Sequence, residues 1–385
     1  MSFEFATATR LLFGAGKLAE VPAALRAQGV RRTLVATNLP GQGCDRLRSL
    51  LTAAGIESAV LLVNQEPTAD LVSAGRKRCR REGCDAVVGL GGGSAMDMGK
   101  AVAALATNEG ELLDYLEVVG RGRPLQARPL PFVAIPTTAG TGAEVTRNAV
   151  IGVPAAKVKV SLRSPYLLPI LAVLDPDLLD GLPRSVVAHS GLDALAHLLE
   201  GLVSCRGNPL TDALGAEGLR RSARALRLAY TSGLQAETRE DLMLSSLCGG
   251  LSLANGGLGA VHGFAAPLGG MLHAPHGAIC AALLVPVMEA NLRALAEREP
   301  EHPARARYRE IAEIVTGRHG AAAEDGLAWV RDLCQALDVR GLGQHGLSAG
   351  EIPALVAKAK AASSMRGNPV QLSDEELGDV VMRAL

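Results

Sequence analysis

The chain has 385 residues, more than one ordinary hydrophobic core holds, and this length favours two domains. Its 39 Lys and Arg balance its 39 Asp and Glu, and it has no basic run with interleaved aromatic residues, so nucleic acid is excluded as the expected partner. The seven cysteines are scattered, odd in number and without CxxC pairs, which argues against a disulfide framework or a thiolate zinc site and predicts reduced thiols that mostly pack.

From residue 31 to about residue 177, short apolar runs alternate with longer amphipathic stretches, a rhythm typical of βαβ units. The runs are nearly continuous in apolar character, as strands buried on both faces are. They cover residues 33–37, 59–63, 86–90, 132–135 and 171–174. Helical spacing is predicted over residues 43–54 and 71–82. The pattern predicts an α/β domain with a parallel sheet over residues 1–180.

After Pro183 the strand-like runs disappear and helical patterns dominate to the end of the sequence. Glycine or proline clusters break these patterns near residues 207–209, 256–277, 299–303 and 341–346. We therefore predict a second, all-helical domain over residues 181–385, joined to the first near residues 175–185.

One predicted strand runs directly into three glycines and Ser94, and then into a helix. Glycines allow backbone amides to approach a pyrophosphate, and the helix directs its positive end at that charge. The motif departs from both GxGxxG and the P-loop, which favours a different dinucleotide fold. A tight strand-to-helix turn in which Ser94 caps the helix is the structural alternative.

A second cluster, rich in glycine and threonine, spans residues 136–146 and also follows a predicted strand. It offers hydroxyls and amides to ribose and phosphate oxygens, or simply forms a hydrogen-bonded turn. Open α/β sheets bind ligands just past the carboxyl ends of their strands, where both clusters fall.

Asp193 and His197 lie four residues apart in a predicted helix, so their side chains project from one face. Further on, His262, His273 and His276 fall in a segment interrupted by Gly and Pro. Such oxygen and nitrogen ligands suit iron(II), zinc, manganese, cobalt or nickel. Any single histidine here is more often a satisfied helix or loop residue, but four of the chain's eight histidines gather in these two segments.

Five motifs in this order, GGGSAMDMGK, PTTAGTGAEVT, LDPDLLDGLP, GLDALAHLLE and VHGFAAPLGGMLHAPHG, resemble the iron-containing alcohol dehydrogenases over about residues 3–295. The resemblance implies a Rossmann-like α/β domain followed by an all-helical domain, an architecture shared with dehydroquinate synthase. It also implies a metal-dependent alcohol dehydrogenase that transfers hydride between a small alcohol and NAD(P). The residues at the family's metal-ligand positions are Asp193, His197, His262 and His276. They would bind Fe²⁺, with Zn²⁺, Mn²⁺, Co²⁺ or Ni²⁺ as alternatives.

The resemblance also implies the cofactor-binding residues. Gly92, Gly93 and Ser94 would hold the pyrophosphate, with Asp97 supporting that turn. The other cofactor-side positions are Asn38, Thr137, Thr138, Thr146, Asn148, Lys159, Leu178 and Gly181. Many NAD-specific members have an aspartate after the second strand, where this chain has Asn38, so we expect NAD with NADP tolerated.

The sequence departs from the family at Ala266, where a histidine usually follows the third metal ligand by four residues. Any proton relay through that imidazole is absent. His273 is the nearest candidate for a catalytic substitute, although it is equally compatible with a supporting or surface role.

The partner is expected to be a small alcohol or aldehyde, in a pocket lined by residues such as Asn148, Leu251 and Phe264. Residues 1–10 lack a signal-peptide pattern, and no segment approaches the roughly 20 uninterrupted apolar residues that span a bilayer, so we expect a cytoplasmic protein without a membrane partner. Family habit suggests a homo-oligomer, a dimer or larger.

Alternative functions share the same architecture: a glycerol dehydrogenase, a maleylacetate reductase or a lyase like dehydroquinate synthase. A lyase acting on an acidic substrate should have more basic residues than Arg147, Lys157, Lys159 and Arg163. A non-catalytic nucleotide-binding sensor is a further alternative, motivated by Ala266.

Overall fold

The computed structural model describes residues 2–39, 41–156 and 158–385. The chain forms two compact units. One comprises residues 6–181, and the other comprises residues 182–385 together with the N-terminal residues up to Phe5.

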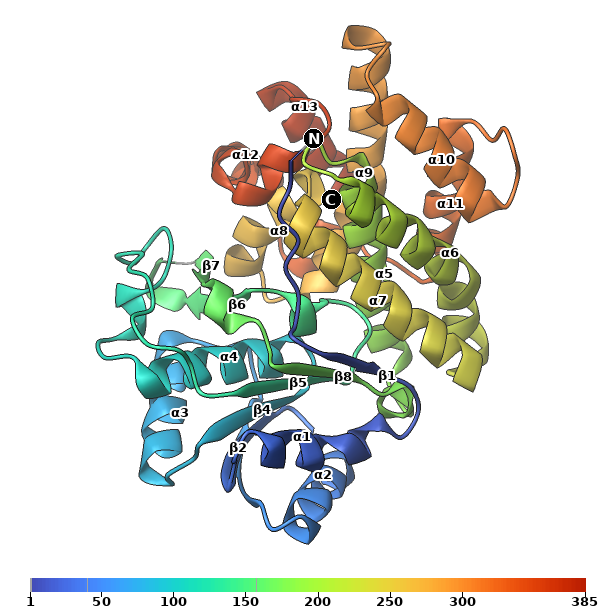
Figure 1. Cartoon of the computed structure of the whole chain (residues 1–385). Helices are drawn as coiled ribbons and strands as arrows, with labels where there is room; N and C mark the ends of the chain where they lie inside the picture. Colours follow the sequence, from blue (N-terminus) through green and yellow to red (C-terminus); the bar gives the residue numbers. More distant parts are fainter. Residues whose placement is uncertain (1, 40, 157) are drawn as a thin grey trace. The chain divides into compact units, whose positions relative to one another are not determined.

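The first unit is built on a six-stranded parallel sheet (Figure 1). Its strands, in the order β1-β8-β5-β4-β2-β3, are β1 (Leu11–Phe13), β8 (Leu171–Leu174), β5 (Phe132–Pro136), β4 (Ala86–Gly91), β2 (Arg32–Thr37) and β3 (Glu57–Leu62). All five predicted strands are confirmed. The edge strand β1 was not predicted, because three residues are too few to reveal a period.

Helices cover both faces of this sheet, as the apolar strands require. On one face, α1 (Val21–Ala27) and α2 (Gln42–Ala53) share a buried core with the sheet that includes Leu25, Leu47 and Val133. On the other face lie α3 (Ala69–Arg81) and α4 (Gly93–Thr107), as Figure 1 shows. The two predicted helices are therefore confirmed as α2 and α3.

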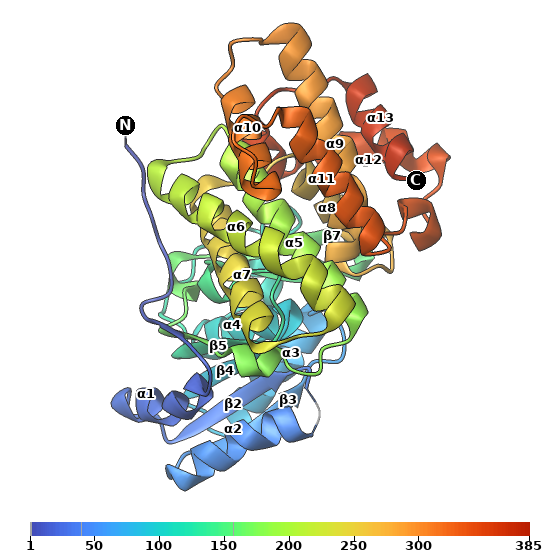
Figure 2. The ribbon, with the colours of Figure 1, turned by 90° about the vertical axis from the view of Figure 1, so that its right-hand side faces the viewer.

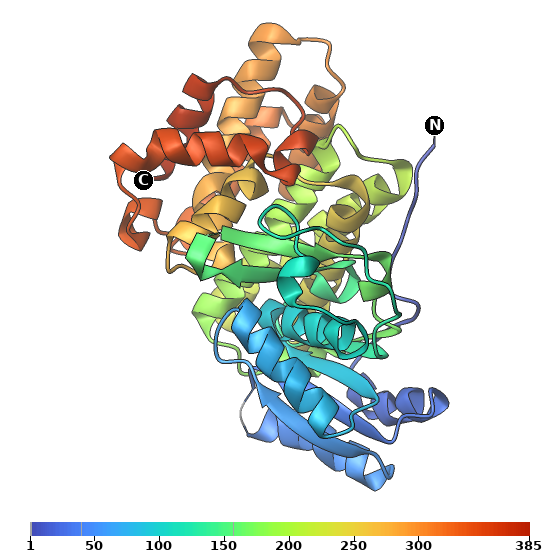
Figure 3. The same cartoon turned by 90° about the vertical axis from the view of Figure 1, so that its left-hand side faces the viewer.

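An antiparallel hairpin of β6 (Asn148–Val153) and β7 (Val158–Arg163) packs beside α4, green and cyan respectively in Figure 3. Its strands were not predicted. The sequence of β7 alternates apolar with charged or polar residues, so this strand lacks the continuous apolar character by which the central strands were found.

The second unit is helical, and no strand occurs among its described residues (Figure 2). Its α-helices are α5 (Arg184–Val203), α6 (Pro209–Ser232), α7 (Ala236–Gly256), α8 (Ala260–Met271), α9 (His276–Arg298), α10 (Ala304–Thr316), α11 (Ala323–Ala336), α12 (Ile352–Ala361) and α13 (Asp374–Ala384).

The prediction of a continuous break over residues 256–277 was wrong, because α8 lies inside it. Gly263, inside α8, allows a neighbouring segment to pack against the helix and does not end it. A side chain at Gly263 would bring its Cβ within 2.7 Å of Met365 Cε, so glycine permits the close approach of the segment Ser363–Gly367.

Two helices, α5 and α9, contain 18-residue stretches with mean hydropathies of 1.2 and 1.6, long and apolar enough by composition to cross a membrane. Of these stretches, 83% and 78% respectively are buried inside the protein. Core helices meet the same criterion, so the apolar character of α5 and α9 is accounted for by packing.

A buried lysine anchors the segment that follows β5. Lys100, on α4, is almost inaccessible, and its Nζ donates hydrogen bonds to the carbonyls of Ala143 and Thr146, both at 2.6 Å, and of Asn148 at 3.1 Å. It also donates to Thr146 Oγ1 at 3.0 Å. Burial lowers the pKa of Lys100 to about 8. These bonds tie residues 143–148 to the helix that starts at the glycine turn.

Glu144 lies in the same anchored segment and provides a test of it. The carboxyl is buried, and burial raises its pKa to about 7 from 4.5. A carboxyl with a raised folded-state pKa contributes stability that is fully present below pH 4.5 and is lost as the pH rises through about 7.

We expect wild-type protein to lose roughly 2 kcal/mol more unfolding free energy than Glu144→Gln between about pH 5 and about pH 7.5. Chemical denaturation followed by circular dichroism measures this difference. Exposed Glu109→Gln is the control and should follow wild type. Parallel pH dependences of wild type and Glu144→Gln would contradict the buried-carboxyl account.

Candidate functional site

A buried carboxylate on α5 is the centre of the candidate metal site. Asp193 is 2% exposed, and within the described residues its Oδ1 has no hydrogen-bond partner. His197 follows one turn later on the same helix and is also buried, with its Nε2 3.9 Å from Asp193 Oδ1. Helical spacing therefore produces the alignment expected from the sequence.

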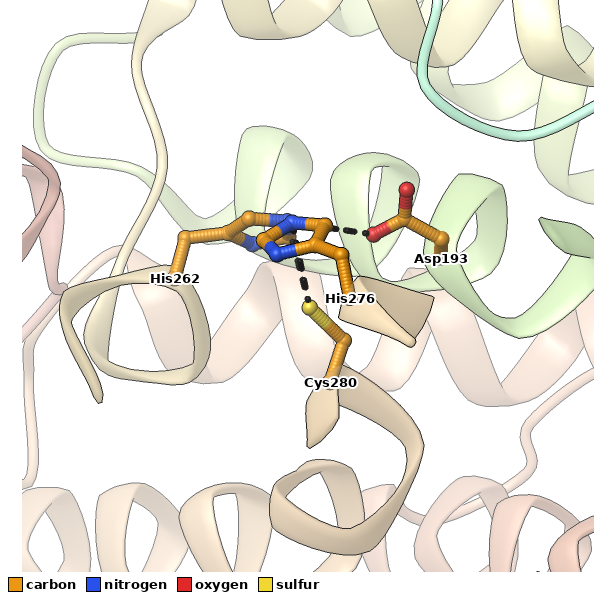
Figure 4. A group of neighbouring side chains, drawn as sticks. All are labelled: Asp193, His262, His276 and Cys280. Atoms are coloured by element: carbon orange, nitrogen blue, oxygen red, sulfur yellow. Dashed lines mark hydrogen bonds and ion pairs between the residues drawn. The ribbon is translucent and has the colours of Figure 1, made fainter. Parts of the chain in front are cut away.

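Two further imidazoles reach this carboxylate from α8 and the start of α9. His262 Nε2 lies 3.4 Å from Asp193 Oδ1, and His276 Nε2 lies 3.6 Å from it. The rings of His197 and His262 stack with their centroids 4.6 Å apart. Figure 4 shows Asp193, His262 and His276 directed toward a common point. The structure thus brings together three of the four predicted ligands, Asp193, His262 and His276, while His197 stacks on His262 just outside the group of converging ligand atoms.

A thiol that the sequence analysis did not select completes this cluster. Cys280 lies one turn after His276 on α9, and its Sγ is 3.6 Å from Nε2 of both His262 and His276. The ligand atoms of Asp193, His262, His276 and Cys280 all lie within 4.8 Å of one another. The four-residue spacing of His276 and Cys280 was the missed signal, because the thiols were expected mostly to pack.

Glu200, also missed, orients His262 from behind. Its Oε2 lies 2.7 Å from His262 Nδ1, and its Oε1 accepts a hydrogen bond from the backbone N–H of Val261 at 2.7 Å. An acidic partner at Nδ1 holds the proton there and leaves the Nε2 lone pair facing Asp193, as in histidines that bind metals. No local spacing signals this contact, because Glu200 and His262 are 62 residues apart in the chain.

The electrostatics of the cluster suit a cation. Burial opposes ionisation of Asp193, but the three imidazoles outweigh it and hold the pKa of this carboxyl far below its usual range. Burial also disfavours the charged form of His276, yet Cys280 and Asp193 raise its pKa to about 9. A divalent cation would meet the same negative potential and would displace the imidazole protons.

The relay candidate His273 is exposed and lies in the connection between α8 and α9. Among the described residues, it is not a member of the cluster around Asp193. Ala266 is half-buried on α8, one turn after His262. Residues four apart share a helix face, so position 266 projects on the side of His262.

The glycine turn lies at a topological switch point of the α/β unit. The chain passes from β2 outward to β3, returns to β4 and then continues in the opposite direction to β5. Ligands of open α/β sheets bind in the crevice at such a reversal, outside the carboxyl ends of the strands. Asn38 follows β2 there and accepts a hydrogen bond from the N–H of Gly92 at 3.3 Å through Oδ1.

The glycine turn depends on the close approach of its backbone to the side chain of Asn38. Gly91 has φ +153°, and a Cβ on it would lie 2.1 Å from Asn38 Oδ1. Helix α4 begins at Gly93 with Gly92 as its N-cap, and no side chain caps it. The alternative in which Ser94 caps the helix is therefore wrong. The uncapped amides of the first turn keep their capacity to bind an anion.

The threonine cluster lies against this turn. The N–H of Thr137 donates to the Gly91 carbonyl at 3.0 Å. A Cβ at Gly92 would lie 3.3 Å from Thr138 Oγ1, and one at Gly93 would lie 2.9 Å from Thr141 Cγ2. Thr138 and Thr141 are half-buried and thus partly accessible.

Four of the predicted cofactor residues have other roles visible in the structure. The Thr146 hydroxyl donates to the Ala143 carbonyl at 3.2 Å and accepts from Lys100. Lys159 Nζ is paired with Glu66 Oε1 at 2.6 Å. Asn148 opens β6, and Leu178 packs against the core between α1, α2 and the sheet.

The remaining predicted positions can also be placed. Asp97 is half-buried on α4, and Gly181 is exposed with φ +72°. Leu251 and Phe264, expected to line the substrate pocket, are buried in the helical unit. Lys157 lies outside the described residues.

The Glu200 contact predicts a loss of metal affinity without loss of the ligands themselves. Glu200→Gln removes the negative charge behind His262 and should weaken divalent metal binding by about 10–100-fold. Competition with a chelator measures the affinity. Glu217→Gln, which alters a carboxylate paired with Arg220 and Arg221 at the surface of α6, is the control. Unaltered affinity in Glu200→Gln would contradict the orienting role.

Comparison with known proteins identifies relatives for both units. Residues 8–176 match the family described as iron-containing alcohol dehydrogenase, and residues 187–385 match the C-terminal part of the Fe-containing alcohol dehydrogenase family. Alcohol dehydrogenase 4 of Schizosaccharomyces pombe is 34% identical over 380 residues, which cover 97% of this chain and 87% of that protein.

Solved structures agree with this assignment. A 1,3-propanediol oxidoreductase is similar with a TM-score of 0.91 and 32% identity, covering 100% of both chains. The sulfoacetaldehyde reductase of Bifidobacterium kashiwanohense, solved in complex with NAD⁺, is similar with a TM-score of 0.87 and 26% identity, covering 100% of this chain and 99% of that one. This chain belongs to the iron-containing alcohol dehydrogenase family.

Proposed function

We propose that this alcohol oxidoreductase interconverts a small primary alcohol and its aldehyde, with NAD as the hydride carrier and one divalent metal, iron(II) by family. The convergence of Asp193, His262 and His276, with His197 on the next turn, is the observation that carries the proposal. A buried carboxylate surrounded by imidazole Nε2 atoms is a donor set that fits a divalent first-row metal.

The helical unit supplies the metal ligands and their orientation. Asp193 and His197 are presented by α5, His262 by α8 and His276 by the first residue of α9. Glu200 holds the proton of His262 at Nδ1 and so keeps Nε2 available. A cation bound there supplies Lewis acidity that polarises the alcohol or carbonyl oxygen.

The α/β unit supplies the nucleotide site. The amides at the start of α4 would bind a pyrophosphate, and glycines at 91–93 would leave room for it. Thr138 and Thr141 offer accessible hydroxyls beside the same turn. We infer a supporting role for Thr146 because Lys100 already occupies its hydroxyl.

NAD is favoured over NADP by the residue at the end of β2. Asn38 accepts a hydrogen bond from the glycine turn and offers no positive charge to a 2′-phosphate. It also lacks the negative charge that would repel one, so NADP is tolerated. The NAD⁺ complex of the sulfoacetaldehyde reductase supports the same cofactor.

The substrate class follows from the relatives. The names of two of them point to 1,3-propanediol, whose hydroxyls are on terminal carbons, and to sulfoacetaldehyde, an aldehyde. We therefore propose a primary alcohol. A homo-oligomeric state and a cytoplasmic location also remain proposals, supported by the family resemblance.

Two variants in separate units test the proposal together. His276→Ala should lower metal affinity by at least about 10-fold, because it removes a direct ligand, and should leave NAD binding largely intact. Gly93→Val should weaken NAD binding by about 10-fold or more, because its Cβ would lie 2.9 Å from Thr141 Cγ2, and should retain the metal.

Mass spectrometry measures the metal content of both variants, and calorimetry measures their NAD affinity. Each variant is therefore the control for the other. Full metal occupancy with normal turnover in His276→Ala would refute the metal site. Unchanged NAD affinity in folded Gly93→Val would reduce the glycine turn to a structural connection.

The absence of histidine at position 266 leads to a separate prediction. Alcohol oxidation releases a proton, and if exposed His273 relays it, His273→Ala should slow oxidation by roughly 10²-fold with the metal retained. Adding Ala266→His should restore part of the rate, because that position projects on the side of His262.

Steady-state rates across a pH series provide the measurement, and His319→Ala, which removes a fully exposed imidazole elsewhere in the helical unit, is the control. If His273→Ala leaves both the rate and its pH profile unaltered, proton release proceeds without this residue, through water.

A further inference from the structure

We propose that Cys280 is a direct ligand of the metal, and that its thiolate shifts the ion preference of the site toward Zn²⁺ at the expense of Fe²⁺. This inference rests on the metal-dependent function proposed above. It adds a sulfur donor to Asp193, His262 and His276, the three predicted ligands whose donor atoms converge with it.

The distances around Cys280 fit coordination of one ion. A sulfur about 2.3 Å and a nitrogen about 2.1 Å from the same ion, at tetrahedral angles, lie about 3.6 Å apart. Cys280 Sγ is 3.6 Å from Nε2 of both His262 and His276. Two nitrogen or oxygen ligands lie about 3.3–3.6 Å apart by the same geometry, and Asp193 Oδ1 is 3.4 and 3.6 Å from these two imidazoles.

A hydrogen bond donated by the thiol accounts for only part of this arrangement. A thiol has one proton and two imidazole nitrogens face it, so it can satisfy only one of them. The proton of His262 is directed to Glu200, which leaves its Nε2 as an acceptor. Asp193 Oδ1 still has no hydrogen bond among the described residues. One cation at the common point would satisfy all these atoms.

The position of Cys280 separates it from the other thiols. Its side chain is fully buried on α9 and points into the cluster, as Figure 4 shows. Within the described part of the chain, no other cysteine belongs to a group of potential metal ligands. Cys334, which is also buried and lies on α11, therefore offers a control.

A thiolate ligand has a chemical consequence for metal choice. Soft sulfur donors favour zinc, whereas oxygen and nitrogen donors discriminate less against iron(II). Binding converts the Cys280 thiol into a thiolate, and its proton passes to solvent as the metal–sulfur bond forms. Zinc outcompetes iron(II) at most sites, with or without sulfur, so zinc binding alone does not identify a thiolate ligand. The informative quantity is the change in the preference for zinc over iron(II) when the sulfur of Cys280 is removed.

Cobalt(II) reports the ligand directly. We expect Co²⁺ added to metal-free wild-type protein to give both visible d–d bands and a near-ultraviolet thiolate-to-cobalt charge-transfer band. Cys280→Ser should keep the d–d bands and lose the charge-transfer band, while Cys334→Ser should keep both. Anaerobic competition between Zn²⁺ and Fe²⁺ should show zinc selectivity falling by about 10-fold or more in Cys280→Ser only.

X-ray absorption of the wild-type zinc protein tests the ligand without any variant. A sulfur scatterer at about 2.3 Å is expected, and a shell of nitrogen and oxygen alone would overturn the inference. A charge-transfer band that survives in Cys280→Ser would overturn it as well, while leaving the metal site intact. Absence of cobalt d–d bands in wild type would instead refute the proposed metal-dependent function itself, and Cys280 ligation with it.

Discussion

The carboxylate of Asp193 is buried with one oxygen outside any hydrogen bond in the described structure, and an ionised group in that state is costly unless positive charge meets it. The helical unit meets this requirement by directing imidazoles from α5, α8 and α9 at one point. Cys280 and Asp193 together raise the pKa of His276, so an imidazole proton can balance the charge of the carboxylate. A metal replaces such a proton, so the same constraint links ion binding to the packing of three helices.

A complementary arrangement organises the α/β unit. There the buried charge is the ammonium of Lys100, and backbone carbonyls with one hydroxyl satisfy it. Because these acceptors lie in residues 143–148, the lysine ties the segment after β5 to the helix that begins at the glycine turn. The glycine turn and the segment after β5 are thus linked by a buried group, Lys100.

The residues around the metal cluster determine its chemistry as much as the ligands expected from the family. Glu200 sets the tautomer of His262, and Cys280 introduces a polarisable sulfur among harder donors. Ala266 removes an imidazole from the same neighbourhood. Together these features are the basis of the proposals on metal preference and on the path of the proton.

The sequence by itself determined the features that depend on local spacing. Continuous apolar runs predicted the central strands, and four-residue spacing predicted that Asp193 and His197 share a helix face. It did not reveal the hairpin β6–β7, helix α8, the contact of Glu200 with His262, or the approach of Cys280 to two imidazoles. These depend on residues distant in the chain, such as Glu200 and His262 or His262 and Cys280. Only the packing of α5, α8 and α9 decided that these groups meet, because side-chain distances across a core follow from tertiary contacts rather than from sequence spacing.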